Sequence, residues 1–508
     1  MRASSILSFN VAFIVAGVLS AGPGARPGVA AYVVVDTGQS VCTDTVTVIS
    51  CPSAGAPFHG QDAQFAGLSP SFVDDRDGTV TDRRTGLMWQ KGLLENISWD
   101  DAVAEAATFH LAGYHDWRLP TIKELYSLIR FDGYFGTDST SSVPFIDRDY
   151  LTFHYLGGAR FFDVQEWSAT SYVGTTMHGD ATAFGVNFAD GRIKGYPKTQ
   201  PGGAKTLKYA RYVRGPAYGD NSFRDNGDGT VSDAATGLLW SRSDSGTAMK
   251  WEDALAWVDA QNAAGTLGYR DWRLPNAKEL QSIVDYSQAP DAVDPAQRGP
   301  AIDPLFQITS IGGDEYPYFW TGTTLPDGPP DAKWTKAIYL SFGRALGWME
   351  EPVGSGHWVL LDVHGAGAER CDPKTGDPED YPHGFGPQGD VARIFNYVRL
   401  VRGGTSTSGI GRPVGTRSGL DLRIRPNPGF GTAGLSFSLP SAGPIRLEIL
   451  DPSGRRMRDL SGFRPAGAGF VLWDGADSRG SKMAAGSYFA RLESSDGVKT
   501  AKILLFAR

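Results

Sequence analysis

Short runs of alternating hydrophobic and polar residues, separated by glycine-containing turns, occur twice along the chain. The first set begins with Phe72-Val-Asp-Asp-Arg-Asp-Gly-Thr-Val-Thr-Asp82, and the second with Phe223-Arg-Asp-Asn-Gly-Asp-Gly-Thr-Val-Ser-Asp233. Such alternation predicts half-buried strands, and the Asp-Gly pairs predict tight turns between them. The two starts lie 151 residues apart (223 minus 72). Because solenoid repeats are far shorter, this spacing predicts two tandem domains of one fold.

Each repeat is also predicted to contain two short helices. The first helix of repeat one follows Ser98-Trp-Asp-Asp101, where a serine N-cap precedes acidic first-turn residues. Lys250 replaces this serine in repeat two, so we expect that helix to fray more. The second helix follows Trp117-Arg-Leu-Pro120 in repeat one and Trp272-Arg-Leu-Pro275 in repeat two. Its predicted capping boxes are Thr121 with Glu124 and Asn276 with Glu279.

The matching segments set the expected domain boundaries. The chain divides into a signal peptide (1–31), an N-terminal segment (32–71), repeat one (72–215), repeat two (223–403), a Gly/Ser-rich linker (404–419) and a C-terminal domain (420–508). Repeat two is longer, and we place its additional residues in the acidic stretch from Glu350 to Asp390. The alternating run Ile445-Arg-Leu-Glu-Ile-Leu450 predicts a half-buried strand in the last domain.

The large hydrophobic residues of the repeated motifs are expected to form the cores. These residues are Trp89, Trp117, Leu119, Leu125, Trp240, Trp272, Leu274 and Leu280. An alternative is that Trp117-Arg118 and Trp272-Arg273 form exposed platforms for a glycan. We favour the core, because a tryptophan beside a capped helix is more often a packing anchor.

The charge distribution argues against a nucleic-acid partner. The chain has 508 residues and a net charge of −8. Residues 216–403 hold 15 lysines and arginines against 27 aspartates and glutamates. An acidic domain of this kind repels phosphate polymers.

The N-terminus predicts export. An apolar run from Ile6 to Ala21 follows Arg2, and Gly/Pro/Ala-rich sequence comes next, as in a secretory signal with cleavage after Ala21 or Ala31. No later stretch approaches the 18 or so apolar residues of a membrane span. We therefore expect a secreted or cell-surface protein without an integral membrane segment after cleavage.

Three cysteines are compatible with an oxidising compartment. Cys42 and Cys51 flank a predicted hairpin, so a local disulfide is plausible there. Cys371, the third cysteine, has no remaining cysteine with which to form a disulfide. It lies in sequence near His364 and His383, but these spacings match no closed zinc pattern.

The turn carboxylates are candidate calcium ligands. They are Asp74, Asp77 and Asp82 in repeat one and Asp225, Asp228 and Asp233 in repeat two. The spacing departs from an EF-hand, and aspartate also stabilises tight turns by local hydrogen bonds, which we favour. No paired acids, phosphate-binding loop or Cys–His pair recurs in both copies. The sequence therefore predicts a non-enzymatic protein with no cofactor, calcium being the one candidate.

The Asp-Gly-Thr-Val, Thr-Gly-Leu-x-Trp and Trp-Arg-Leu-Pro-x-x-Lys-Glu-Leu motifs resemble the Lcl C-terminal domain family, which includes a bacterial adhesin for sulfated glycans. This resemblance and the element order imply two tandem C-type-lectin-like domains, hence an α+β fold. They also imply an exported binding protein for a surface glycan, polymer or cell-surface protein. The alternatives are a structural spacer and, less favoured, a C-type-lectin-fold enzyme. A related family oxidises cysteines with its own cysteines, but the repeats hold only Cys371.

The C-terminal domain resembles a second kind of module. Pro426-Asn-Pro, Asp451-Pro-Ser-Gly454, Trp473-Asp-Gly and Ala485-Gly-Ser-Tyr-Phe are similar to the immunoglobulin-like module of flagellar hook-capping proteins and to type IX sorting domains. The resemblance implies an all-β sandwich with Trp473 packed beside Tyr488. It also implies a role in attachment or export.

Overall fold

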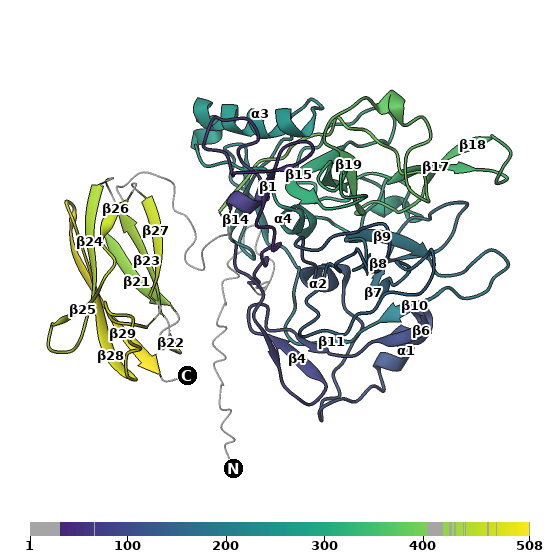
Figure 1. The fold of residues 1–508 in the computed structure, drawn as a ribbon. Coiled ribbons are helices and arrows are strands. Elements are labelled where there is room, and N and C mark those ends of the chain that lie inside the picture. Colours follow the sequence, from purple (N-terminus) through teal and green to yellow (C-terminus); the bar gives the residue numbers. More distant parts are fainter. Residues whose placement is uncertain are drawn as a thin grey trace, which may run out of the picture. The chain divides into compact units, whose positions relative to one another are not determined.

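The computed structural model describes residues 31–65, 67–403, 420–425, 429–430, 433–439, 441, 443–464, 467–473 and 475–506. Apart from Ala31, the predicted signal peptide lies outside the described residues, as does the 404–419 linker. The chain divides into two compact units, Met1–Ile410 and Gly411–Arg508 (Figure 1). Within the described residues, no helix is both long enough and apolar enough to cross a membrane.

The expectation of an α+β protein with C-type-lectin-like domains is wrong, because the described residues are largely β. The α-helices among them are α1 (Trp99–Ala106), α2 (Ile122–Ser127), α3 (Trp251–Ala264) and α4 (Ala277–Ser282). Single 3₁₀ turns are η1 (Asp62–Gln64), η2 (Thr266–Gly268), η3 (Pro295–Gln297) and η4 (Pro378–Asp380). The capping motifs therefore specify only short helices, and the intervening glycine- and proline-rich sequence folds into strands and loops.

Each repeat begins with a four-stranded meander whose last strand comes from the end of the same repeat. In repeat one its strands are β3 (Phe72–Asp74), β4 (Thr79–Asp82), β5 (Met88–Gln90) and β11 (Val213–Arg214). In repeat two they are β12 (Phe223–Asp225), β13 (Thr230–Asp233), β14 (Leu238–Ser241) and β20 (Val401–Gly403). Trp89 lies opposite Val80 and Val213 in the first meander, so the two ends of the repeat meet at a buried tryptophan.

The two repeats share one eight-stranded sheet, so they are not separate compact domains. In spatial order its strands are β15 (Tyr318–Leu325), β16 (Lys336–Ser341), β19 (Glu369–Pro373), β9 (Arg192–Pro197), β8 (Thr182–Asn187), β7 (Glu166–Ser171), β10 (Leu207–Ala210) and β6 (Leu94–Ser98). The repeats join where β19 pairs with β9, with Glu369 opposite Ile193. This continuous sheet is a second reason why the predicted pair of lectin-like domains does not hold.

The additional residues of repeat two create this junction. In repeat one, β9 follows β8 and pairs with it. In repeat two, the strand that follows β16 is β17 (Leu346–Glu350), which leaves the sheet and forms a separate hairpin with β18 (Trp358–Asp362). Figure 1 shows this hairpin projecting from the rest of the unit. The vacated edge of β16 is taken by β19, which comes from the predicted insertion.

The N-terminal segment contacts both repeats, and in repeat one the N–H of Phe131 donates to the carbonyl of Thr37. Its strands β1 (Cys42–Thr43) and β2 (Val48–Ile49) pair, and a disulfide joins Cys42 to Cys51. The Gln39 amide donates to the carbonyl of Thr324 in β15 at 2.7 Å and accepts from its N–H at 2.9 Å. The buried Asp62 carboxylate accepts from the hydroxyl of Thr323, at 2.7 Å, and burial raises its pKa to about 7.

The eight predicted core residues are all buried, none more than 4% exposed. Trp117 and Trp272 also donate their indole N–H groups to the carbonyls of Leu111 and Thr266. The core assignment is confirmed, and exposed glycan platforms at these tryptophans are excluded.

The predicted capping boxes are present at both α2 and α4. The box glutamates have a second role, because Arg118 forms an ion pair with Glu124 and Arg273 forms one with Glu279. In α1 the Ser98 side chain accepts from the N–H of Asp101, whereas Lys250 provides no side-chain cap for α3. Each Trp-Arg-Leu-Pro segment is thereby fixed to the start of the helix that follows it.

The motif lysines connect α2 and α4 reciprocally. Lys123 at the start of α2 donates to the carbonyl of Ser282 at the end of α4, at 2.7 Å. Lys278 at the start of α4 donates to the carbonyl of Ser127 at the end of α2, at 2.9 Å. Burial lowers the pKa of Lys123 to about 8 and that of Lys278 to about 7. The motif lysine of each repeat thus bonds to the helix of the other repeat, and the two bonds together join α2 to α4.

The C-terminal unit is a β-sandwich. One sheet contains β21 (Asp421–Arg425), β23 (Ala433–Leu439) and β27 (Gly467–Trp473). The other contains β22 (Gly429–Phe430), β29 (Gly497–Phe506), β28 (Gly486–Ser494), β24 (Gly443–Leu450), β25 (Arg456–Asp459) and β26 (Gly462–Arg464). Trp473 and Tyr488 are both buried, with ring centroids 5.6 Å apart, as predicted.

Lys278→Met should reveal the buried lysine through the pH dependence of stability. A lysine whose pKa is lowered on folding contributes stability that is full above its ordinary value of 10.5 and is lost as the pH falls towards 7. We therefore expect the advantage of the wild type over the variant to grow from pH 7 to pH 9, by up to ~1.4 kcal/mol per unit. Urea denaturation at each pH measures this difference in unfolding free energy.

Lys205→Met is the matched control, because Lys205 is exposed and pairs with Asp101 at the surface. Its effect on the unfolding free energy should stay nearly constant between pH 7 and pH 9. A constant effect of Lys278→Met over the same range would contradict the assignment.

Candidate functional site

The six candidate calcium ligands lie in turns, where they accept hydrogen bonds from their neighbours. Asp82 accepts from the N–H groups of Ser71 and Arg84, both at 2.9 Å, and from the hydroxyl of Thr85. Asp233 makes the equivalent contacts in repeat two. Asp77 and Asp228 each accept from the threonine two positions on, while Asp74 pairs with Lys91 and Asp225 with Arg242.

This arrangement favours turn stabilisation over calcium binding. Each of the six carboxylates accepts from at least one N–H, hydroxyl or cationic partner in the same repeat. In the part of the chain that the structure describes, no group of three or more His, Cys, Asp or Glu side chains could hold a metal ion.

Cys371, His364 and His383 have separate partners. Cys371 is buried, and its sulfur accepts from the Arg192 guanidinium at 3.2 Å. His364 is buried against Asp390, with 2.8 Å between Nε2 and Oδ1. His383 instead stacks on Trp358, with ring centroids 4.2 Å apart. The three side chains are therefore not arranged as one metal site.

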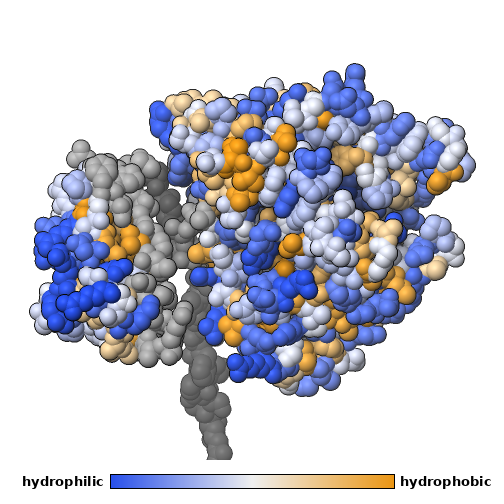
Figure 2. Space-filling model, viewed as in Figure 1, coloured by the Kyte–Doolittle hydropathy of each residue, from blue (hydrophilic) through white to orange (hydrophobic). Residues whose placement is uncertain are grey.

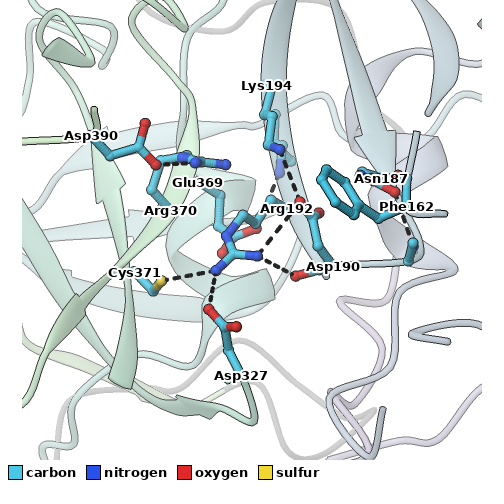
Figure 3. Close-up of polar contacts among 12 residues, drawn as sticks. Phe162, Asn187, Asp190, Arg192, Lys194, Asp327, Glu369, Arg370, Cys371 and Asp390 are labelled. Carbon is cyan, nitrogen blue, oxygen red and sulfur yellow. Dashed lines mark hydrogen bonds and ion pairs between the residues drawn. The ribbon is translucent and has the colours of Figure 1, made fainter. Parts of the chain in front are cut away.

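A buried charge cluster lies at the junction between β9 and β19 (Figure 3). Its members from repeat one are Asp190, Arg192 and Lys194, and those from repeat two are Asp327, Glu369, Arg370 and Asp390. Arg192 pairs with Asp327 and Arg370 with Asp390. Lys194 reaches Asp190 at 2.8 Å. The Arg192–Asp327 pair crosses between the repeats, whereas the Lys194–Asp190 and Arg370–Asp390 pairs each lie within one repeat.

Burial controls the protonation of this charge cluster. It raises the pKa of Glu369 well above its usual range and lowers that of His364 to about 4. Burial also opposes ionisation of Asp390, but Arg370 and His364 outweigh it and hold the Asp390 pKa far below its usual range. Since these side chains are closed off from solvent, the cluster joins the repeats and is not an accessible binding site.

The open candidate site is a groove of about 500 Å³ in repeat two. Its lining residues are Ala248, Ile311, Pro317, Leu346, Trp348, Leu360, Pro378, Val391, Ala392, Arg393, Phe395 and Tyr397. Ile311, Leu360 and Phe395 are 40–42% exposed. Figure 2 shows one face of the molecule, on which hydrophobic patches of different size lie among hydrophilic residues. A concave, mainly apolar lining with few polar groups is typical of a ligand site.

One side of the groove is the β17–β18 hairpin. Trp348 lies opposite Leu360 in the hairpin register, so both side chains lie on the same face. Trp358 lies opposite Glu350 on this face, nearer the tip, where it stacks on His383. The aromatic surface therefore extends from the groove along the hairpin.

The other side is fixed to the central sheet by Asp372 of β19. Its carboxylate accepts from the N–H groups of Arg393 and Ile394 and from the side chain of Asn396. Burial raises the pKa of Asp372 to about 7. These bonds hold the segment that carries Phe395 and Tyr397, while the Arg393 guanidinium lies 4.2 Å from the ring centroid of Tyr318.

The groove was not predicted from the sequence, because the prediction rested on residues common to both repeats. The groove depends on the hairpin and on β19, which belong to repeat two alone. A signal was available in Trp348 and Trp358, which flank the turn-forming Pro352-Val-Gly-Ser-Gly356 and predict a hairpin with aromatic residues on it.

Comparison with known proteins supports the duplication. The family model of the Lcl C-terminal domain matches residues 78–214 and again residues 229–352. No curated protein matches the chain.

Matches to solved structures are partial. FlgD from P. aeruginosa is 31% identical over 14% of this chain and 57% of its own, with a TM-score of 0.12. FlgD from Xanthomonas campestris is 30% identical over 17% of this chain and 61% of its own, with a TM-score of 0.13. Dimeric latent PorU from Porphyromonas gingivalis is 17% identical over 34% of this chain and 18% of its own, with a TM-score of 0.16. The chain thus spans less than two thirds of each structure, and TM-scores this low carry no argument about its fold or role.

Asp82→Ala should destabilise the protein equally with and without calcium. The substitution leaves the N–H groups of Ser71 and Arg84 without their acceptor, so we expect a loss of about 1–3 kcal/mol in the free energy of unfolding. Chemical denaturation in calcium and in chelator measures the loss. A wild-type protein stabilised by calcium, with that gain abolished in the variant, would restore the calcium hypothesis.

Proposed function

The chain belongs to the Lcl C-terminal domain family, and from this membership we propose that it is an exported, non-enzymatic binding protein for a surface glycan or related surface polymer. The family resemblance supplies the ligand class. The groove in repeat two supplies the place where such a ligand would bind.

The observation that carries the proposal is the aromatic lining of this groove. Trp348, Phe395 and Tyr397 line it together with a single cation, Arg393. Aromatic faces bind the apolar faces of sugar rings, while a small number of polar groups fixes their orientation. A volume of about 500 Å³ lies within the range of ligand pockets.

The proposal assigns one such groove to the chain. Two tandem repeats with one site each would gain avidity from linkage. In repeat one, β9 stays in the central sheet, so that repeat lacks the hairpin that forms one side of the groove. The duplication therefore supports binding by holding β16, β19 and their neighbours in one rigid unit.

A structural role is the second candidate function. The repeats form one continuous sheet with a large common core, as a spacer or display module requires. A cell-surface protein is the alternative partner for the same groove.

Trp348→Ala should weaken binding at least tenfold, because it removes an aromatic face from the groove. Tenfold corresponds to ~1.4 kcal/mol. The full-length protein is first screened on glycan arrays with and without calcium, and the best glycan is then titrated by calorimetry. We expect equal binding in both conditions.

Trp334→Ala is the matched control, since this half-buried tryptophan does not line the groove. It should bind like the wild type. Binding that is insensitive to Trp348→Ala would remove the groove from the proposal, and the absence of any glycan ligand would favour the structural role.

Deleting 420–508 should change where the protein is found without changing its glycan affinity. The C-terminal sandwich is a compact unit of its own, so its loss leaves the groove intact. We propose that it serves attachment or export. Cell fractionation and calorimetry on the truncated protein measure the two effects. Unchanged amounts at the cell surface would indicate that the sandwich is only a spacer.

A further inference from the structure

A histidine pair lies at the surface of repeat one, outside the groove and the charge cluster. The Nδ1 atoms of His110 and His115 are 2.6 Å apart, and the ring centroids are 4.3 Å apart. Both side chains are exposed. Two imidazole lone pairs at this separation repel one another unless a proton or a cation lies between them. We propose that His110 and His115 bind a divalent transition-metal ion, for which Cu²⁺ and Zn²⁺ are the natural candidates.

A tight turn presents the two imidazoles to one another. Leu111 and Tyr114 form a β-bridge, and the residues between them, Ala112 and Gly113, have φ values of 54° and 78°. Positive φ at both central positions is typical of the tight hairpin turn whose twist matches the flanking strands. Because His110 and His115 directly flank the bridge, they lie opposite one another across the hairpin.

The turn is held to the body of repeat one. The buried Trp117 donates its indole N–H to the carbonyl of Leu111. The Arg214 guanidinium lies 3.8 Å from the ring centroid of Tyr114 and also pairs with Asp116. These contacts pre-organise the hairpin, so that a metal ion binds without the cost of ordering a free loop.

Repeat two shows that the turn does not need the histidines. The equivalent residues Leu267 and Gly268 also have positive φ, of 54° and 82°. The positions of the histidines are occupied there by Gly265 and Arg270, and Arg270 donates to the carbonyls of Asn262 and Ala263 at the end of α3. The histidine pair is thus an addition to a turn that is stable without it.

The chemistry selects the class of ion. Imidazole nitrogen is a preferred ligand of Cu²⁺, Ni²⁺ and Zn²⁺, with Cu²⁺ bound most tightly of the three. Metal–nitrogen bonds of about 2.0–2.1 Å require only a small outward rotation of two exposed rings. No third His, Cys, Asp or Glu completes the group among the described residues, so water fills the remaining positions. Such a site is open to an additional ligand.

The test compares the wild type with a variant that copies repeat two. The full-length protein, freed of metal by a chelator, is titrated with Cu²⁺ alone and with Zn²⁺ alone by calorimetry. The double substitution His110→Gly with His115→Arg should remove one bound ion and leave thermal unfolding unchanged. His115→Ala should lower the affinity for that ion at least tenfold. The electron paramagnetic resonance spectrum of the Cu²⁺ complex should show two coupled imidazole nitrogens in the wild type.

His357→Ala is the control for adventitious binding by an exposed histidine, and it should retain the wild-type stoichiometry. The proposal is overturned if the double variant binds as many ions as the wild type. It is also overturned if the wild type binds neither ion, since the 2.6 Å contact is then a hydrogen bond between the two rings and nothing more. Glycan binding in the groove does not enter either outcome.

Discussion

The reciprocal lysine contacts between α2 and α4 are the constraint on which the larger unit depends. Each lysine amine replaces water with carbonyls of the opposite repeat, and a buried amine without such acceptors would be costly. The contacts require the two helices to lie with the start of one near the end of the other. Once that orientation is set, the sheets of the two repeats can continue into one another. The motif that identifies each repeat is therefore also the motif that pairs them.

The second junction, between β9 and β19, shows how a duplicated chain has become asymmetric. Strand β19 brings Glu369 and Arg370 into contact with the charged residues of β9, in a place closed off from water. Buried ion pairs contribute little net stability, but removing one partner leaves an uncompensated charge. The junction thus specifies which strand lies beside β9.

Local features were predictable from the sequence, and strand pairing was not. The capping boxes and the buried tryptophans follow from residues a few positions apart, and Trp117, Trp272 and their helices are as expected. The C-type-lectin-like expectation assumed that each repeat closes its own sheet. Nothing local to β9 or β19 indicates that they pair with one another, since 176 positions separate Ile193 from Glu369. The groove also depends on contacts between distant parts of the sequence, because one side is the β17–β18 hairpin and the other is the segment that Asp372 holds.

The N-terminal segment has a consequence for how the chain folds. Gln39 is hydrogen-bonded to Thr324, a residue 285 positions later, and the Thr43 hydroxyl accepts from Lys374, 331 positions later. Contacts of such high order close large loops and slow folding. During synthesis from the N-terminus, this segment therefore stays without these partners until nearly all of repeat two has followed. Until then Gln39 and Thr43 lack these hydrogen-bond partners, so the larger unit closes only late in folding.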